Sequence, residues 1–133
     1  MNQYATVYAG PSTSTYPSIG SVSSGESVSV WWKEGNWYYI QYATSSLPKC
    51  GYVPASTVSG AGSVTAFTPS YGTRYVNTGS TTYYGPGSGY TAAGSVSRGE
   101  SVSYLGYKYN GYAFIQYSVS GTSQKKRAFF WAN

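Results

Sequence analysis

The sequence predicts an all-β protein made of two small domains in tandem. Short runs in which Val, Ile, Thr, Tyr and Trp alternate with Ser and Gly are typical of strands, and no stretch of the 133 residues shows the 3.6-residue apolar period of a helix. Residues 20–29 return almost unchanged as residues 94–103, with Ser24 against Arg98 as the one difference. The period of roughly 75 residues exceeds the ~20–50 residues of solenoid repeats, so each copy is a domain. We call the copies the first and second repeat.

The central strand of the first repeat is predicted over residues 26–32. Successive side chains of a strand point to opposite faces, so Val28, Val30 and Trp32 share one face, which we expect to be the core face. Residues 33–36 contain Gly and Asn, which tolerate a positive φ, and therefore predict a turn after this strand.

The next strand is predicted over residues 37–42, with Tyr38, Ile40 and Tyr42 on one face. A short closing strand follows at residues 51–54. Its last residue, Pro54, cannot donate a backbone hydrogen bond and so marks an edge or an exit from the sheet.

The second repeat keeps this order, with one more residue in its hairpin at residues 108–111 and a longer loop before Phe129. We therefore predict domains at residues 1–58 and 75–133, joined by a Gly- and Ser-rich linker at residues 59–74. The linker also holds three larger side chains, which leave a docked and a free linker equally open: Val64, Phe67 and Tyr71.

Composition points to a core of packed rings. Aromatic residues make up 19% of the chain and charged residues 8%, so ion pairs contribute little to the expected stability. The net charge of +5 is scattered except for residues 125–127, which we interpret as a solvated loop, with weak attraction to anionic polymers as the alternative.

The single cysteine, Cys50, excludes an internal disulfide. No apolar run is long enough for a membrane span, and no signal peptide precedes the first strand-like segment, which favours a soluble protein or a piece of a larger one.

The chain contains few residues of the types that act in catalysis. The chain has no His, no Asp and three acids, of which Glu26 and Glu100 are equivalent positions after a turn glycine and so more consistent with a repeated turn than with a catalytic pair. Cys50 has no imidazole to activate it. We predict no catalytic residue, no metal site and no cofactor. Eight basic residues spread over two domains do not favour nucleic-acid binding either.

Four segments of the first repeat, taken together, are similar to a known family. Residues 7–12 match its opening strand and Gly-Pro turn, and residues 25–26 match the Gly-Glu pair before the central strand. Residues 36–40 match the strand that contains a tryptophan, and residues 51–54 match the closing strand. Each repeat therefore resembles the bacterial SH3 (SH3b) domain, a small β-barrel appended to peptidoglycan hydrolases and phage endolysins. The resemblance implies two tandem SH3-like β-barrels joined by a short linker.

The second repeat departs from this pattern in three places. Thr82 replaces Val7, Tyr112 replaces Trp37, and residues 128–131 replace the Gly-Tyr-Val-Pro segment. We therefore do not expect the two repeats to have the same ligand preference.

The resemblance implies a binding role without catalysis. It points to a module that targets a lytic enzyme, such as an endolysin of a bacteriophage, to Gram-positive cell wall peptidoglycan through a peptide, cross-bridge or glycan. The catalytic domain of the parent protein would then lie upstream, and the module would act at the cell wall or outside the cell. Two alternatives stay open: an SH3-like peptide-binding adaptor and a surface structural module.

Aromatic residues that strand parity leaves off the core are the candidates for ligand contact, because Tyr and Trp rings stack on sugars and peptide groups and add a polar tip. In SH3 folds the groove combines a first-strand tyrosine, a tryptophan and a closing-strand proline, which the resemblance assigns here to Tyr8, Trp37 and Pro54. Two weakly binding copies on a repeating polymer would gain avidity of ~10²–10⁴. The complete set of predicted ligand-binding residues is Tyr8, Trp31, Trp37, Tyr52 and Pro54 in the first repeat and Tyr83, Tyr112 and Trp131 in the second.

Overall fold

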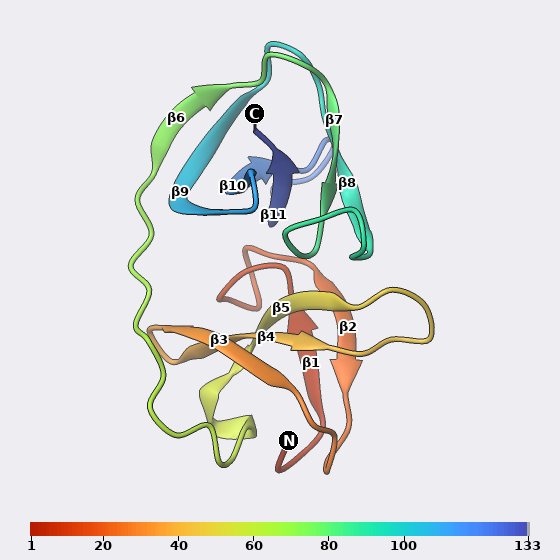
Figure 1. The fold of residues 1–133 in the computed structure, drawn as a ribbon, viewed down its shortest axis with the longest axis vertical. Coiled ribbons are helices and arrows are strands. Elements are labelled where there is room, and N and C mark those ends of the chain that lie inside the picture. Colours follow the sequence, from red (N-terminus) through yellow and green to blue (C-terminus); the bar gives the residue numbers. More distant parts are fainter. Residues whose placement is uncertain (133) are drawn as a thin grey trace.

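The computed structural model describes residues 1–132 and shows two separate antiparallel sheets stacked along the long axis of the molecule (Figure 1). The first sheet has five strands in the order β2-β1-β5-β4-β3, and the second has six in the order β6-β9-β10-β11-β7-β8. The prediction of an all-β chain with two small SH3-like domains is confirmed. In chain order the elements are β1 (Ala5–Tyr8), β2 (Ser18–Val22), β3 (Ser29–Glu34), β4 (Trp37–Tyr42), β5 (Lys49–Pro54), the short 3₁₀ helix η1 (Ala55–Thr57), β6 (Gly72–Tyr75), β7 (Ser80–Tyr83), β8 (Ala92–Val96), β9 (Ser101–Tyr109), β10 (Tyr112–Ser118) and β11 (Lys125–Trp131).

The duplication in the sequence is a duplication of the fold. Without β6, the strand order of the second sheet repeats that of the first, with β7 to β11 in the places of β1 to β5. Both sheets also have a register irregularity at the same point of the first hairpin, between Val7 and Tyr8 and between Thr82 and Tyr83. β6 is the strand without a counterpart; it begins within the predicted linker and pairs with β9.

The core of the first repeat lies where alternation predicts it. Val7, Ile40 and Val53 are fully buried in one cluster, and Tyr42 and the partly buried Tyr38 pack there too. Val28 and Val30 also pack against this cluster, as predicted.

Trp32 does not share that face, and this prediction is wrong. Val30 lies opposite Ile40, but Trp32 lies opposite Tyr39, so the register shifts by one residue between them. A bulge of this kind inserts an extra residue and reverses the parity of the strand beyond it. The Trp32 ring therefore stacks on Tyr39, with ring centroids 4.3 Å apart, on the other side of the sheet.

The linker is docked rather than free. The Lys33 amide donates to the Thr65 carbonyl oxygen (2.9 Å), and the Phe67 amide donates to the Lys33 carbonyl oxygen (2.8 Å), so the linker adds a short parallel bridge to β3. Further along, the Ser70 amide donates to the Leu105 carbonyl oxygen (3.0 Å) in β9. The linker thus follows one side of both repeats (Figure 1). No helix in residues 1–132 is long and apolar enough to cross a membrane.

Candidate functional site: two aromatic patches beside a shared interface

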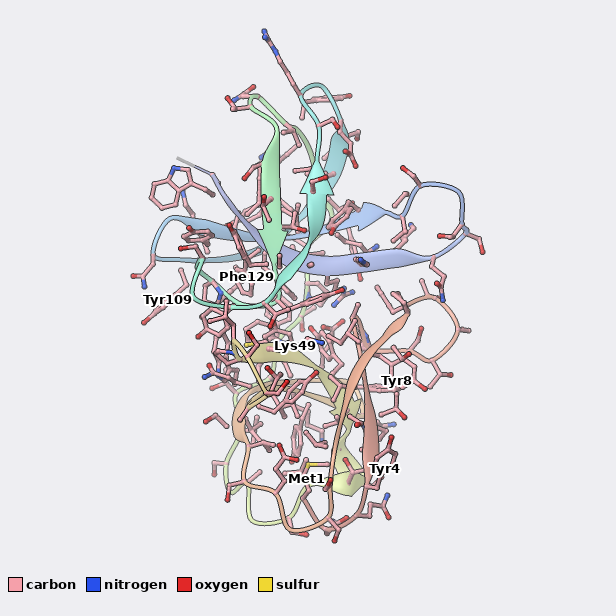
Figure 2. All side chains as sticks on the ribbon, turned by 90° about the vertical axis from the view of Figure 1, so that its right-hand side faces the viewer. Met1, Tyr4, Tyr8, Lys49, Tyr109 and Phe129 are labelled. Atoms are coloured by element: carbon pink, nitrogen blue, oxygen red, sulfur yellow. The ribbon has the colours of Figure 1, made fainter. Side chains whose placement is uncertain are left out.

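The two repeats pack against each other through the sheet faces that point away from their own barrel cores. The shared cluster combines Trp32, Tyr39, Cys50 and Tyr52 of the first repeat with Leu105, Phe114 and Phe129 of the second. Figure 2 shows side chains filling the space between the two sheets, with Phe129 on the side of the second repeat that faces the first. These aromatic faces are therefore largely occupied by the partner repeat, and only their margins are left for a ligand.

Reciprocal hydrogen bonds show that this interface is close to twofold symmetric. The Tyr16 hydroxyl donates to Gln116 Oε1 (2.6 Å), and the Tyr90 hydroxyl donates to Gln41 Oε1 (3.0 Å). Tyr16 and Tyr90 each precede the repeated Gly-Ser-Val segment by the same spacing, and Gln41 and Gln116 each precede an aligned tyrosine. A contact in which each partner offers the same surface is isologous, the arrangement of most symmetric dimers, here built within one chain.

The Gly-Pro turn of each repeat supports the reciprocal tyrosine. A Cβ atom at Gly10 would lie 2.3 Å from the Tyr16 ring, and one at Gly85 would lie 2.1 Å from the Tyr90 ring. Gly85 also has a φ of 154°, which side chains rarely adopt. Only glycine lets these rings lie flat against the turn, which gives the family motif a structural reason at both positions.

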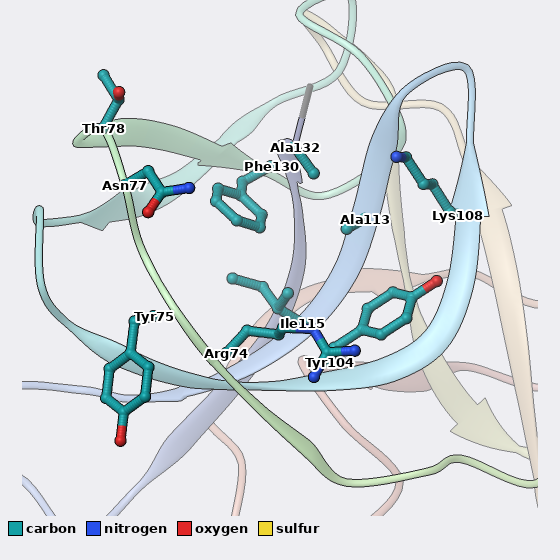
Figure 3. Close-up of a pocket in the computed structure, with 10 residues that line it drawn as sticks. All are labelled: Arg74, Tyr75, Asn77, Thr78, Tyr104, Lys108, Ala113, Ile115, Phe130 and Ala132. Atoms are coloured by element: carbon teal, nitrogen blue, oxygen red, sulfur yellow. The ribbon is translucent and has the colours of Figure 1, made fainter.

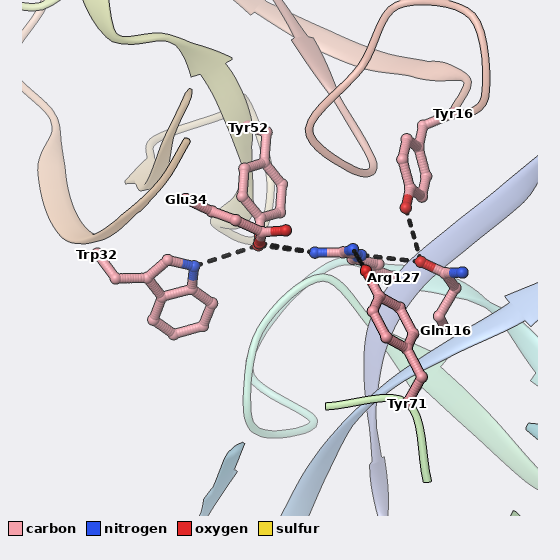
Figure 4. A network of polar contacts seen from close by, with 7 residues as sticks. All are labelled: Tyr16, Trp32, Glu34, Tyr52, Tyr71, Gln116 and Arg127. Atoms are coloured by element: carbon pink, nitrogen blue, oxygen red, sulfur yellow. Dashed lines mark hydrogen bonds and ion pairs between the residues drawn. The ribbon is translucent and has the colours of Figure 1, made fainter. Parts of the chain in front are cut away.

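Arg127 is the central polar residue of the interface (Figure 4). Its side chain is 2% exposed and forms an ion pair with Glu34 (Nη1 to Oε1, 2.7 Å). Its other nitrogens donate to Gln116 Oε1 and the Tyr71 hydroxyl, both at 3.0 Å. Burial by itself disfavours the charge, but Tyr52, Tyr16 and Glu34 together raise the pKa of Arg127 above its ordinary value. The interpretation of residues 125–127 as a solvated loop is therefore wrong, because all three residues lie within β11 and Arg127 is buried.

Tyr52 links this network to the aromatic cluster. Its hydroxyl accepts from Trp32 Nε1 (3.1 Å) and donates to Glu34 Oε1 (2.9 Å), and its side chain has no exposed surface. Parity correctly placed it off the barrel core, but the second repeat covers that face. Tyr52 therefore has no surface for the ligand contact that we predicted and acts in holding the repeats together.

Tyr8, Trp37 and Pro54 come together at the margin of the interface, and we call them the first aromatic patch. The Tyr8 and Trp37 rings meet edge to face with centroids 6.0 Å apart, and Trp37 lies opposite Pro54 in the β4–β5 register. All three are partly exposed. β5 brings them together because it pairs with β1 on one side and β4 on the other.

Tyr83, Tyr112 and Trp131 form the equivalent second aromatic patch. Tyr112 lies 6.4 Å from Tyr83 and 5.2 Å from Trp131 between ring centroids, and Trp131 is 49% exposed. Trp131 occupies the place of Pro54 in the register, so this patch has three rings where the first has two. Six of the eight predicted residues thus assemble into two equivalent patches.

The eighth residue, Trp31, lies apart from both patches. It is partly buried, and its ring approaches Tyr90 of the second repeat edge to face at 6.5 Å. It borders a groove of about 350 Å³ between the linker and both repeats, which is lined by Trp31, Trp32, Thr65, Ala66, Phe67 and Tyr107.

The chemically reactive side chains, two carboxylates and a thiol, have structural roles. Glu26 Oε1 accepts the Ser23 amide, and Glu100 Oε1 accepts the Ser97 amide, both at 3.0 Å, so these acids close equivalent turns. Cys50 is buried in the interface, and burial raises the pKa of its thiol, which keeps it protonated. Within residues 1–132 no group of three or more His, Cys, Asp or Glu side chains is placed to hold a metal ion.

Buried tyrosines make stability sensitive to alkaline pH. Burial raises the pKa of Tyr39, Tyr42, Tyr52 and Tyr84 above the ordinary value near 10. Below pH ~10 both states keep these protons, whereas above it only the unfolded state loses them. We expect constant stability up to about pH 9 and, above pH 10, a fall of up to ~1.4 kcal/mol per pH unit for each buried tyrosine. Urea unfolding from pH 7 to 11 measures this, and unchanged stability at pH 11 would contradict it.

The fold defines a small β-domain with a partly exposed aromatic margin, and sequence comparison agrees with the fold. Residues 4–59 match the family model of the bacterial SH3 domain, which supports such a domain in the first repeat. No curated protein matches the chain. Bacterial SH3 domains are typically non-catalytic binding modules and commonly bind cell walls.

Proposed function

We propose that this chain binds bacterial cell wall peptidoglycan through the two aromatic patches and thereby places a lytic enzyme, such as a phage endolysin, on its substrate. The observation that carries the proposal is that both repeats leave an equivalent aromatic patch exposed while the rest of the same face is buried. A bacterial SH3 domain over residues 4–59 supports the same role.

The chemistry of the patches suits a wall polymer. Partly exposed Tyr and Trp side chains offer apolar ring surface and polar tips, on which sugars and peptide groups can stack and hydrogen bond. The net charge of +5 favours approach to anionic wall polymers within a Debye length of ~8 Å, which accelerates encounter without supplying specificity.

Docking of the repeats changes how two sites would cooperate. The reciprocal tyrosine–glutamine bonds and the buried Arg127 hold the patches at a set separation and orientation. Avidity then depends on whether the polymer presents its units at that spacing, because a rigid pair gains nothing from sites that it cannot engage together. A regular polymer such as peptidoglycan meets this condition better than isolated peptides do.

Replacing one ring in each patch tests the proposal. We expect Trp37→Ala and Tyr112→Ala each to reduce co-sedimentation with purified Gram-positive cell walls by roughly tenfold, as for other aromatic anchors, and the double variant to reduce it further. Binding by the unchanged protein should survive removal of anionic polymers from the walls. Tyr4→Ala is the matched control, because Tyr4 is 63% exposed and lies in neither patch.

Three results would contradict the proposal. Failure to sediment with walls from several species would favour an adaptor that binds peptides or a surface structural module. Loss of binding when anionic polymers are removed would indicate charge attraction alone. Equal effects of Tyr4→Ala and Trp37→Ala would show that the patches are not the site.

A further inference from the structure

The second repeat has a pocket of about 360 Å³ between β6, β9, β10 and the end of β11 (Figure 3). Its volume lies at the low end of the ~300–1,000 Å³ typical of small-molecule sites. None of the eight residues predicted as ligand contacts lines it. The pocket is therefore distinct from both aromatic patches.

The two repeats differ at one position that lines this pocket. Tyr38 lies opposite Lys33 in the β3–β4 register, and Ala113 lies opposite Lys108 at the equivalent place in the β9–β10 register. The Tyr38 ring packs against the core of the first repeat, whereas Ala113 has only a methyl group there. The second barrel consequently has room where an aromatic ring fills the first.

The rim of the pocket is cationic. Arg74 and Lys108 contribute positive charges from β6 and β9, and no acidic residue is among the described residues that line the pocket. Arg74 is exposed, donates from Nη1 to the Thr73 carbonyl oxygen (3.0 Å), and lies 5.7 Å from the centroid of the Tyr104 ring. Arg74 belongs to β6, the strand without a counterpart in the first repeat, so this charge is specific to the second.

The interior of the pocket is apolar. Ala113 and Ile115 are buried, and Phe130 is partly buried beside them. The pocket thus offers a surface for a small apolar group directly below a cationic rim.

We propose that this pocket binds the carboxylate end of a short peptide whose last side chain is small and apolar. The fork of the Arg74 guanidinium matches the two oxygens of a carboxylate. An apolar side chain beside the carboxylate would occupy the space above Ala113 and Ile115. A bare phosphate would leave that apolar surface without a contact. The site does not depend on the aromatic patches or on cell wall binding.

Titration of the full chain with acetyl-alanyl-alanine, followed by the methyl NMR signals of Ala113 and Ile115, tests the proposal. We expect saturable shifts with a Kd on the order of 1 mM, as for a ligand of this size. The C-terminal amide of the same dipeptide, which has no charge, should bind at least about tenfold more weakly. Equal binding of the amide, or tighter binding of glycerol phosphate at the same methyl groups, would overturn the assignment to a peptide carboxylate.

Two variants and a matched control connect binding to the pocket. Ala113→Tyr restores the residue of the first repeat and should abolish binding, and its melting curve checks that the variant is folded. Arg74→Gln should weaken binding roughly tenfold, because a charge-assisted pair is lost. Arg98→Gln removes the same charge at an exposed turn that does not line the pocket, and should leave the affinity unchanged. Retained affinity in a folded Ala113→Tyr variant, or an equal loss in both arginine variants, would overturn the proposal.

Discussion

Replacement of Arg127 by alanine is expected to lower the free energy of unfolding by about 3–5 kcal/mol. The guanidinium is 2% exposed, and the Glu34 side chain with which it pairs is 14% exposed. Removing one member of a buried pair leaves the other charged and without its partner, and this accounts for most of the cost. The same substitution also removes the donors to Gln116 and Tyr71. Urea unfolding of the variant at neutral pH measures the effect.

Lys125→Ala is the control, because it removes a positive charge only two residues from Arg127, and the Lys125 side chain is exposed. Its effect should stay within about 0.5 kcal/mol, as for most surface substitutions. A double-mutant cycle with Glu34→Gln isolates the ion pair, and we expect a coupling energy of at least ~1 kcal/mol because the two residues are in direct contact. Arg127→Ala and Lys125→Ala variants of equal stability would show that the network does not hold the repeats together.

The sequence was sufficient to predict the repeated all-β fold and much of the barrel core of the first repeat. Tyr38, Ile40 and Tyr42 follow from simple alternation because β4 is regular throughout. Trp32 does not, because the bulge after Val30 depends on how β3 bends over the sheet, and two adjacent tryptophans give no sign of where parity reverses.

Docking of the repeats was harder to predict, although the sequence contains signals for it. Strands β4 and β5 have large side chains on both faces of the sheet, and Tyr39 and Tyr52 lie on the face away from the barrel core. Large side chains on both faces are the pattern of strands that are buried on both sides. Glu34 is the one acid that does not follow a turn glycine, and Arg127 stands directly before an apolar run, which together point to a buried pair. Their pairing depends on the angle between the repeats, and each repeat considered alone does not specify that angle.

The same interface explains which predicted ligand residues are exposed. Docking uses the middle of each aromatic face and leaves its margin, so Tyr52 is buried whereas Tyr8 and Trp37 remain accessible. Phe129 occupies the equivalent buried place in the second repeat, opposite Tyr83. One sheet face therefore supplies both the contact between repeats and the candidate binding surface.

Replacement of Phe114 by alanine is expected to destabilise both repeats together, by about 3–5 kcal/mol. Phe114 belongs to the second repeat, has no exposed surface, and lies with its ring centroid 5.4 Å from both Trp32 and Tyr39 of the first. A domain of ~60 residues buries a marginal amount of apolar surface, so each repeat relies on the shared cluster. The two repeats should therefore unfold in one cooperative transition.

Tryptophan fluorescence in a Trp131→Phe background distinguishes this result from independent unfolding, because the three remaining tryptophans, Trp31, Trp32 and Trp37, all lie in the first repeat. In Phe114→Ala the fluorescence transition and the circular dichroism transition should shift equally and remain coincident. Tyr109→Ala, at a 53% exposed aromatic position in the same repeat, should shift neither by more than about 0.5 kcal/mol. A fluorescence transition that stays at its original midpoint in Phe114→Ala would show that the repeats are independent. The two aromatic patches would then be joined only by the linker, and their spacing on a polymer would no longer be set by the interface.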